Sequence, residues 1–259
     1  MTCRFPMCPN ATNWQRLSVL LLAGCLWTLQ AGCGSHVYKQ RLAKTAKYYE
    51  SLDRLKRSLS RPWRAEGIEI RVPKQFVLLP ISPENQFDPE ADHEDSTDEV
   101  EDDDGLQPDD MGDILPGLLG AWEAMVSVEG VARPCYMYVM SNHYLLKNRS
   151  DESIDFYEEV VNEIIDGLDL LFPEENRWSM ESIPPGLGYV EKKEFRKIRL
   201  RPNEFVDDVR TDFTIYMFQK EIVRVALLFV VPRGIDSQEK MYERIALSLE
   251  TLSVSSSEK

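Results

Sequence analysis

Residues 212–231 read DFTIYMFQKEIVRVALLFVV, and this run carries the clearest structural signal in the sequence. Its two halves, 212–218 and 222–231, are rich in β-branched and aromatic residues and flank the polar turn Gln219-Lys220-Glu221, which predicts two antiparallel strands. The second half is apolar almost throughout, and such a run is typical of a strand buried on both faces. We therefore expect a sheet whose central strand is 222–231.

The flanking sequence extends this sheet. Residues 188–201 combine Phe195, Ile198 and Leu200 with many charges, which predicts a partly exposed or edge strand, because lysine and arginine discourage edge pairing. Further β-type runs precede it, and the last two are joined across the turn signal Glu129-Gly130, which indicates a hairpin. These runs are residues 68–72, 76–81, 118–128 and 135–140.

Two helices are predicted from apolar residues at helical spacing. The first covers residues 151–171 and ends before Pro173, and the second runs from Gln238 to Leu252, after which residues 253–259 should fray. Strands and helices in this order indicate the fold class α+β, with an antiparallel sheet whose faces are covered by helices. We place this globular domain at residues 66–252.

The N-terminal part is predicted to be an export signal. Residues 17–29, LSVLLLAGCLWTL, form an apolar run of 13 residues, too short for the ~20 of a transmembrane helix but suited to the core of a signal peptide. Small residues precede a cysteine at Ala31-Gly32-Cys33. This pattern resembles the lipobox of bacterial lipoproteins, in which a peptidase cuts before the cysteine and the new terminal cysteine carries acyl chains.

We favour Cys33 as the lipid attachment site. Cys25, in Leu22-Ala23-Gly24-Cys25, is the alternative, but it leaves a short apolar core. Residues 1–32 are then a lipoprotein-type signal peptide, and the protein belongs to the cell envelope, anchored to a membrane and facing the periplasm. An ordinary secretory peptide cut near Gly32 and an uncleaved membrane-associated segment remain open.

Residues 33–65 are predicted to form the anchor and a basic helical stalk. Between residues 35 and 64, nine lysines and arginines oppose two acids, and Pro62 should end the helix. The stripe consists of Tyr38, Leu42, Tyr49, Leu52 and Leu59. Two interpretations are open: anionic lipid headgroups attract the arm by ~1 kcal/mol per basic residue, or the stripe packs on the domain and the charges are merely solvated.

Residues 84–113 interrupt the domain with fifteen acids and no lysine or arginine. Self-repulsion and the scarcity of apolar residues predict a disordered acidic insertion. The run Asp102-Asp103-Asp104-Gly105 suggests calcium, but an EF-hand loop with Gly105 as its sixth position would need ligands at Val100 and Met111. We therefore predict no metal site.

The sequence contains few candidates for catalysis. Histidine occurs only at positions 36, 93 and 143, and none of the common catalytic or nucleotide-binding signatures is present. We predict no catalytic residues and no cofactor. The alternative is an envelope hydrolase whose site is built from carboxylates or from Cys135, with His143 eight residues on as a possible base. The formal net charge of −14 argues against nucleic acid as a partner.

The order of elements also resembles the PsbP-like α/β/α sandwich, which an extrinsic photosystem II subunit shares with Ran-binding Mog-type proteins. The points of resemblance are Ile70-Arg71-Val72-Pro73-Lys74 before the first strand and Leu228-Phe229-Val230-Val231-Pro232 before the closing helix, which ends at Ser248-Leu249. The resemblance covers residues 68–252 without the acidic insertion. It implies an adaptor or accessory role and no common catalytic residues.

The whole chain is also similar to uncharacterised bacterial envelope lipoproteins, through Tyr48-Tyr49, Arg61-Pro62-Trp63 and Val72-Pro73-Lys74. Together these observations predict a non-catalytic, lipid-anchored binding or scaffolding module that holds a protein partner in the envelope.

Overall fold

The structure is a computed structural model, and it divides the chain into two compact units, residues 1–54 and 55–259. The predicted signal peptide with Cys25 and Cys33, and the acidic insertion 84–113, lie outside the described residues. The described residues are 34–81, 115–148, 155–168, 170–171, 178–184, 191–202 and 210–255.

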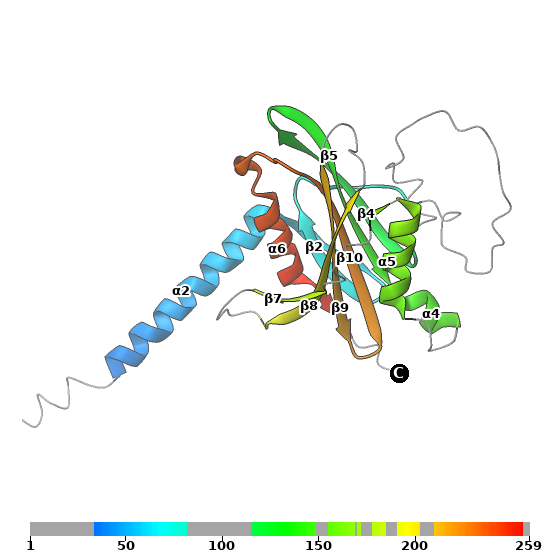
Figure 1. Ribbon diagram of the computed structural model, residues 1–259. Helices are drawn as coiled ribbons and strands as arrows, with labels where there is room; N and C mark the ends of the chain where they lie inside the picture. Colours follow the sequence, from blue (N-terminus) through cyan, green and yellow to red (C-terminus); the bar gives the residue numbers. More distant parts are fainter. Residues whose placement is uncertain are drawn as a thin grey trace, which may run out of the picture. The chain divides into compact units, whose positions relative to one another are not determined.

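Helix α2 occupies most of the basic segment. It runs Gly34–Ser58 and ends before Pro62, the residue that was predicted to stop it (Figure 1). The next residues form strand β1, Leu59–Ala65, which is paired with β2, Ile68–Pro73. Pro62 is accommodated because β1 is an edge strand of its sheet. The strands therefore begin before the domain boundary that the sequence predicted at residue 66.

A three-stranded sheet has the order β1-β2-β11. Its last strand, β11, is Ser253–Val254, which pairs with β2. The prediction that the chain frays from residue 253 onward was therefore wrong for these two residues. Strand β11 covers only the first two residues of β2, and helix α6, Met241–Thr251, binds the same edge of β2 further along, at Arg71. The Ser248 hydroxyl donates to the Arg71 carbonyl at 2.6 Å, and the Arg71 N–H donates to the Thr251 hydroxyl at 2.9 Å. Two helix side chains thus satisfy backbone groups that a further strand would otherwise bind.

The described residues also form an antiparallel eight-stranded sheet, with the order β3-β4-β5-β10-β9-β8-β6 and β7 paired with β8. Two hairpins, β4-β5 and β9-β10, lie where the sequence predicted them. The bounds are β3 Val77–Leu78, β4 Leu118–Val128, β5 Val131–Ser141, β6 Leu170–Leu171, β7 Ser179–Ile183, β8 Lys193–Pro202, β9 Thr211–Lys220 and β10 Val223–Pro232.

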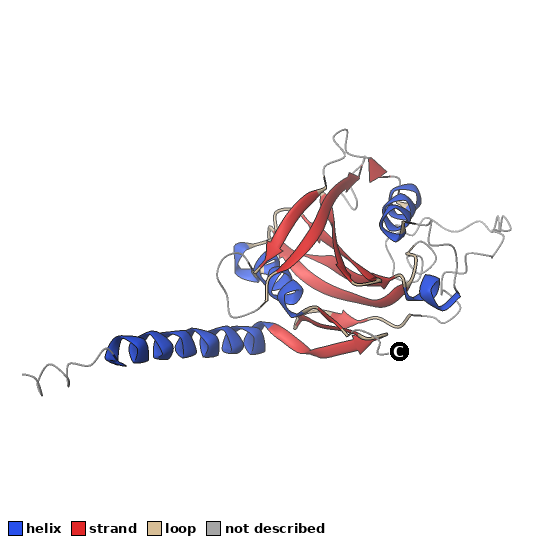
Figure 2. Ribbon diagram, turned by 90° about the horizontal axis from the view of Figure 1, so that it is seen from below, coloured by secondary structure: helices blue, strands red, loops and turns tan. Residues whose placement is uncertain are grey.

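Strand β10 is central and buried on both faces, as predicted. Val225, Leu227 and Phe229 point into one apolar cluster with α6 and the three-stranded sheet, and the alternate residues Ala226 and Leu228 point into a second cluster with helix α5, Phe156–Gly167. Figure 2 shows these layers on the two sides of the large sheet, with the short helix α4, His143–Asn148, beside α5. The fold class α+β, with an antiparallel sheet covered by helices, is confirmed.

Two predicted elements need correction. In place of the helix predicted over 151–171, the structure describes a helix over 156–167. At its start the Asp155 side chain accepts a hydrogen bond from the Tyr157 N–H. Residues 170–171, which were predicted to be helical, form strand β6 and pair with β8. Strand β8 is partly exposed, as one of the two predicted alternatives had it, but it is not an edge strand, because it lies between β9 on one side and β7 and β6 on the other. Two of its basic residues have partners inside the fold: the Lys197 ammonium lies 2.7 Å from a Glu181 carboxylate oxygen, and the Arg196 guanidinium lies 4.7 Å from the centroid of the Trp178 ring.

Candidate functional site

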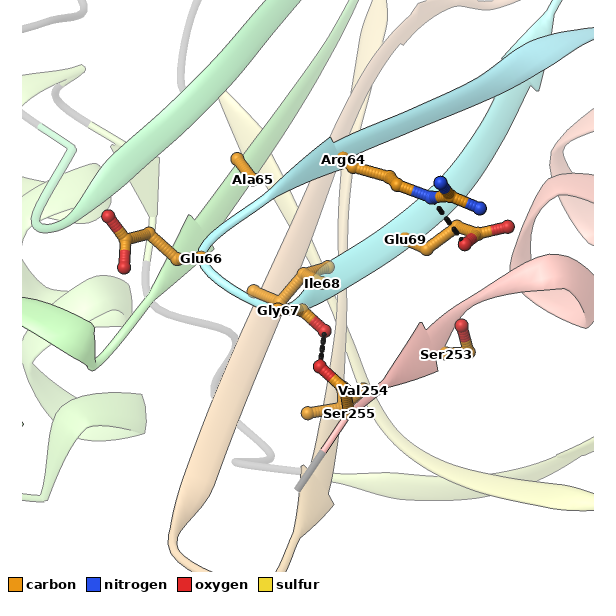
Figure 3. Close-up of a pocket in the computed structure, with 9 residues that line it drawn as sticks. All are labelled: Arg64, Ala65, Glu66, Gly67, Ile68, Glu69, Ser253, Val254 and Ser255. Atoms are coloured by element: carbon orange, nitrogen blue, oxygen red, sulfur yellow. Dashed lines mark hydrogen bonds and ion pairs between the residues drawn. The ribbon is translucent and has the colours of Figure 1, made fainter. Parts of the chain in front are cut away.

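A surface pocket of about 420 Å³ opens beside the turn that joins β1 to β2 (Figure 3). The pocket joins two parts of the chain that are far apart in sequence, because β11 pairs with β2 at this turn. The lining residues are Arg64, Ala65, Glu66, Gly67, Ile68, Glu69, Ser253, Val254 and Ser255.

The turn itself explains why β11 can approach so closely. Glu66 and Gly67 have φ values of 47° and 74°, the paired left-handed conformations of a two-residue hairpin turn. The Gly67 carbonyl accepts hydrogen bonds from both the backbone N–H and the hydroxyl of Ser255, each at 2.9 Å. A Cβ on Gly67 would lie 2.8 Å from the Ser255 hydroxyl oxygen, so glycine is needed for this contact.

The charged side chains of the pocket are paired within the protein. Arg64 Nε donates to Glu69 at 2.7 Å, whereas Glu66 points away from this pair and accepts from Lys147 at 2.9 Å (Figure 3). The hydrogen bond from Lys147 holds the pKa of Glu66 below its ordinary value. The lining therefore presents neutralised ion pairs, backbone groups and two serine hydroxyls. Such groups suit the binding of a polar ligand, and no lining residue is a histidine or cysteine.

The structure does not bring Cys135 and His143 together. Cys135 is fully buried in the cluster between the large sheet and α6, and burial raises the pKa of its thiol, which opposes thiolate formation. His143 begins α4, and its Nδ1 lies 2.6 Å from the hydroxyl of Ser141. Because Cys135 and Ser141 lie six residues apart on the extended strand β5, about 20 Å separates them.

The contact between Ser141 and His143 is one that the sequence analysis missed. Ser141 is buried, and its hydroxyl donates to the Arg224 carbonyl at 3.0 Å, which leaves the oxygen to accept from an Nδ1–H of His143. Asn142 reinforces the same corner, since its amide donates to the Ile222 carbonyl and accepts from the Arg224 N–H. The polar triplet Ser141-Asn142-His143 therefore fixes the end of β5 to the start of β10, a structural role.

This corner gives a pH prediction. Burial lowers the pKa of His143, although the charge of Glu66 partly opposes the shift. The unfolded chain, with a histidine pKa of about 6.5, then binds a proton more readily than the folded chain, so stability falls as pH drops below about 6.5. Urea unfolding at several pH values should show a weaker acid dependence for His143→Asn than for the wild type. Equal slopes would contradict the role given to His143.

Four aromatic residues of the domain, Trp122, Tyr136, Tyr138 and Trp178, pack within the fold and do not line this pocket. Trp122 is buried and packs edge-on against Trp63, with ring centroids 5.0 Å apart. Tyr136 and Tyr138 stack at 6.2 Å on the other face of the sheet, in the cluster that α5 covers. Trp178 is half-buried and stacks with Arg196.

The hydrolase alternative needs two carboxylates that lie close together. In the pocket, Glu66 and Glu69 form ion pairs with different basic side chains, Lys147 and Arg64. Among the described residues, no group of three or more histidine, cysteine, aspartate or glutamate side chains is placed to hold a metal ion. Over the same residues, no helix combines the length and the apolar character needed to cross a membrane.

No protein-family model matches the sequence, and no curated protein matches it. A crystal structure from Bacteroides thetaiotaomicron is similar over 76% of this chain and 48% of its own chain, with 9% sequence identity and a TM-score of 0.32. The chain thus spans about half the length of that solved structure.

Proposed function

We propose that this chain is a non-catalytic, lipid-anchored envelope protein that acts as a binding or scaffolding module. Acyl chains on Cys33, or on Cys25 as the alternative, would hold it at a membrane, with the domain facing the periplasm. The observation that supports this proposal best is α2, Gly34–Ser58, which lies close to the predicted anchor in sequence and is exposed at every residue from 36 to 50.

Helix α2 connects the proposed anchor to the domain. Its 25 residues correspond to a length of about 37 Å. The helix ends at Ser58 and β1 begins at Leu59, so no loop residue separates the two elements.

The domain offers sheet edges as binding surfaces. Both faces of the large sheet are covered, so a partner protein would meet its edges and turns. Two edges carry exposed apolar side chains: Met180 on β7 is 63% exposed, and Val77 and Leu78 on β3 are 67% and 53% exposed. Exposed strand edges bind extended segments of other proteins. An adaptor or accessory role, as the PsbP-like resemblance implies, agrees with this use.

The anchor is tested by metabolic labelling with a palmitate analogue. We expect the wild type and Cys25→Ser to be labelled and Cys33→Ser to lose the label, because only the terminal cysteine left by cleavage is acylated. Label that is lost with Cys25→Ser instead would move the site to Cys25. An unlabelled wild type would rule out the anchor.

Partner binding is tested by photo-cross-linking in intact membranes. A photoreactive amino acid at Met180 should give a discrete adduct with an envelope protein. The matched control is Ile222, which is 61% exposed but lies in the β9-β10 turn, away from a sheet edge. The same adducts from both positions, or none from Met180, would contradict binding at the β7 edge.

A further inference from the structure

One side of α2 carries a continuous apolar stripe. Tyr38, Leu42, Thr45, Tyr49 and Leu52 follow one another at spacings of 4, 3, 4 and 3 residues, which places them on one helix face. Tyr38, Leu42 and Tyr49 are 67%, 56% and 61% exposed. The Thr45 hydroxyl donates to the Arg41 carbonyl at 3.0 Å, so its polar group is satisfied within the helix and its methyl group can face an apolar medium.

The helix that carries this stripe is strongly basic. Over Gly34–Ser58, seven lysines and arginines oppose two acids, which gives the helix a net charge of 7 − 2 = +5. Lys39 and Arg41 lie on its two sides at the N-terminal end. The full set of basic residues is Lys39, Arg41, Lys44, Lys47, Arg54, Lys56 and Arg57.

We propose that α2 lies in the plane of an anionic lipid surface, with the stripe facing the acyl chains and the basic side chains at the headgroups. Exposed aromatic and leucine side chains on one face, with basic residues beside them, are the composition of interfacial helices. Nine charged residues in 25 make a path across the hydrocarbon unfavourable, so the helix lies on the bilayer. This inference rests on the proposed anchor, which brings α2 to a membrane, and adds a second contact of different chemistry.

A second copy of the chain is the main rival occupant of the stripe. The 4-3 spacing is also that of a coiled-coil seam. Continued by one step, however, the seam reaches Lys56, and each copy would bring a net charge of +5 to the interface. Like charges along facing helices oppose such pairing. An anionic lipid surface has the complementary sign, and charge therefore favours lipid.

The test is hydrogen exchange of the full-length protein in vesicles, read by mass spectrometry over residues 36–50. At low salt, we expect these amides to exchange about tenfold more slowly in vesicles that contain phosphatidylglycerol than in pure phosphatidylcholine vesicles. The difference should fade near 1 M salt, where the Debye length is only ~3 Å. Equal exchange in the two kinds of vesicle would overturn the inference.

Two matched variants separate the helix from general charge effects. Combined replacement of Lys39, Arg41, Lys44 and Lys47 by glutamine should abolish the tenfold difference while keeping a good helix former at each position. The control replaces four exposed basic residues outside α2 by glutamine and should keep the difference. These are Arg61, Lys74, Lys192 and Arg201. Loss of the difference in the control as well would contradict a specific role of α2.

The outcomes also separate this inference from the proposed anchor. Acylated protein whose α2 exchanges equally in both vesicles defeats the lipid contact alone. If the protein carries no acyl chains but anionic vesicles still slow the hydrogen exchange of α2, only the proposed anchor is wrong. Protection that appears without vesicles and grows with protein concentration would assign the stripe to a second copy and overturn the lipid contact.

Discussion

Gly117→Ala is expected to lower the free energy of unfolding by about 3 kcal/mol or more. Gly117 has a φ of 63°, which alanine adopts only with strain, and its added Cβ would lie 2.1 Å from the Ser141 carbonyl oxygen and 2.8 Å from the Tyr144 ring. The backbones cannot simply separate, because the Ser141 N–H donates to the Gly117 carbonyl at 2.9 Å. Urea unfolding followed by tryptophan fluorescence measures the loss.

Gly130→Ala is the matched control. Gly130 has a similar φ of 80°, but nothing lies within 4 Å of the added Cβ. Only the backbone strain remains, at a cost of about 1 kcal/mol. If Gly117→Ala proves no more destabilising than Gly130→Ala, the close approach of the two backbones at the start of β4 is wrong.

Phe229→Ala should cost about 3–5 kcal/mol. The Phe229 side chain is 1% exposed on the central strand β10, and it packs edge-on against Tyr216 at a centroid distance of 5.9 Å. Its loss leaves a cavity between the large sheet and the layer that contains α6 and the three-stranded sheet. Unfolding midpoints in urea, with the slope of the transition checked for two-state behaviour, give the value.

Ile222→Ala serves as the control for Phe229→Ala. Ile222 is a large apolar residue of the same hairpin but is 61% exposed in the turn, so its truncation should change the stability by less than about 0.5 kcal/mol. Similar losses for the two variants would mean that β10 is not the centre of the fold.

The sequence predicted the elements whose signals are local. The β-type runs 212–218 and 222–231 place β9 and β10, and β10, the run that is apolar almost throughout, is buried as expected. The β4-β5 hairpin follows from two apolar runs around Glu129-Gly130, whose φ values of 52° and 80° match the turn that this dipeptide favours. Period and turn chemistry are properties of short segments, so they are readable without the rest of the chain.

Strand β1 escaped prediction because the helical stripe of the preceding segment continues into it in the sequence, and β11 escaped prediction because its partner strand is distant in sequence. Leu59 continues the helical stripe in sequence, yet it is buried because β1 pairs with β2. Ser253 and Val254 carry no strand signal of their own, and they are held by residues 68–69 at the other end of the domain. For the same reason the pocket was not predicted, since residues 64–69 and 253–255 meet only after folding.

The edge position that the charges of β8 suggested as one alternative was wrong, because the partners of these charged residues cannot be read from the sequence. Lysine and arginine in a strand usually mark an exposed edge. Here Lys193 donates to the Glu250 carbonyl near the end of α6, Lys197 pairs with Glu181, and Arg196 stacks on Trp178. These contacts bind β8 to α6 and β7, which makes an interior strand compatible with so many charges.

The central claim, a module tethered through its N-terminal cysteine, is tested most directly by the mass of the N-terminal peptide of the protein purified from membranes. The account predicts a peptide that begins at Cys33 and carries the added mass of acyl chains. Attachment at Cys33 would be contradicted by a peptide that begins at Cys33 or later and carries no acyl chains. It would also be contradicted by a peptide that still contains all of residues 17–32. An acylated peptide that begins at Cys25 would keep the tether but move its site to Cys25.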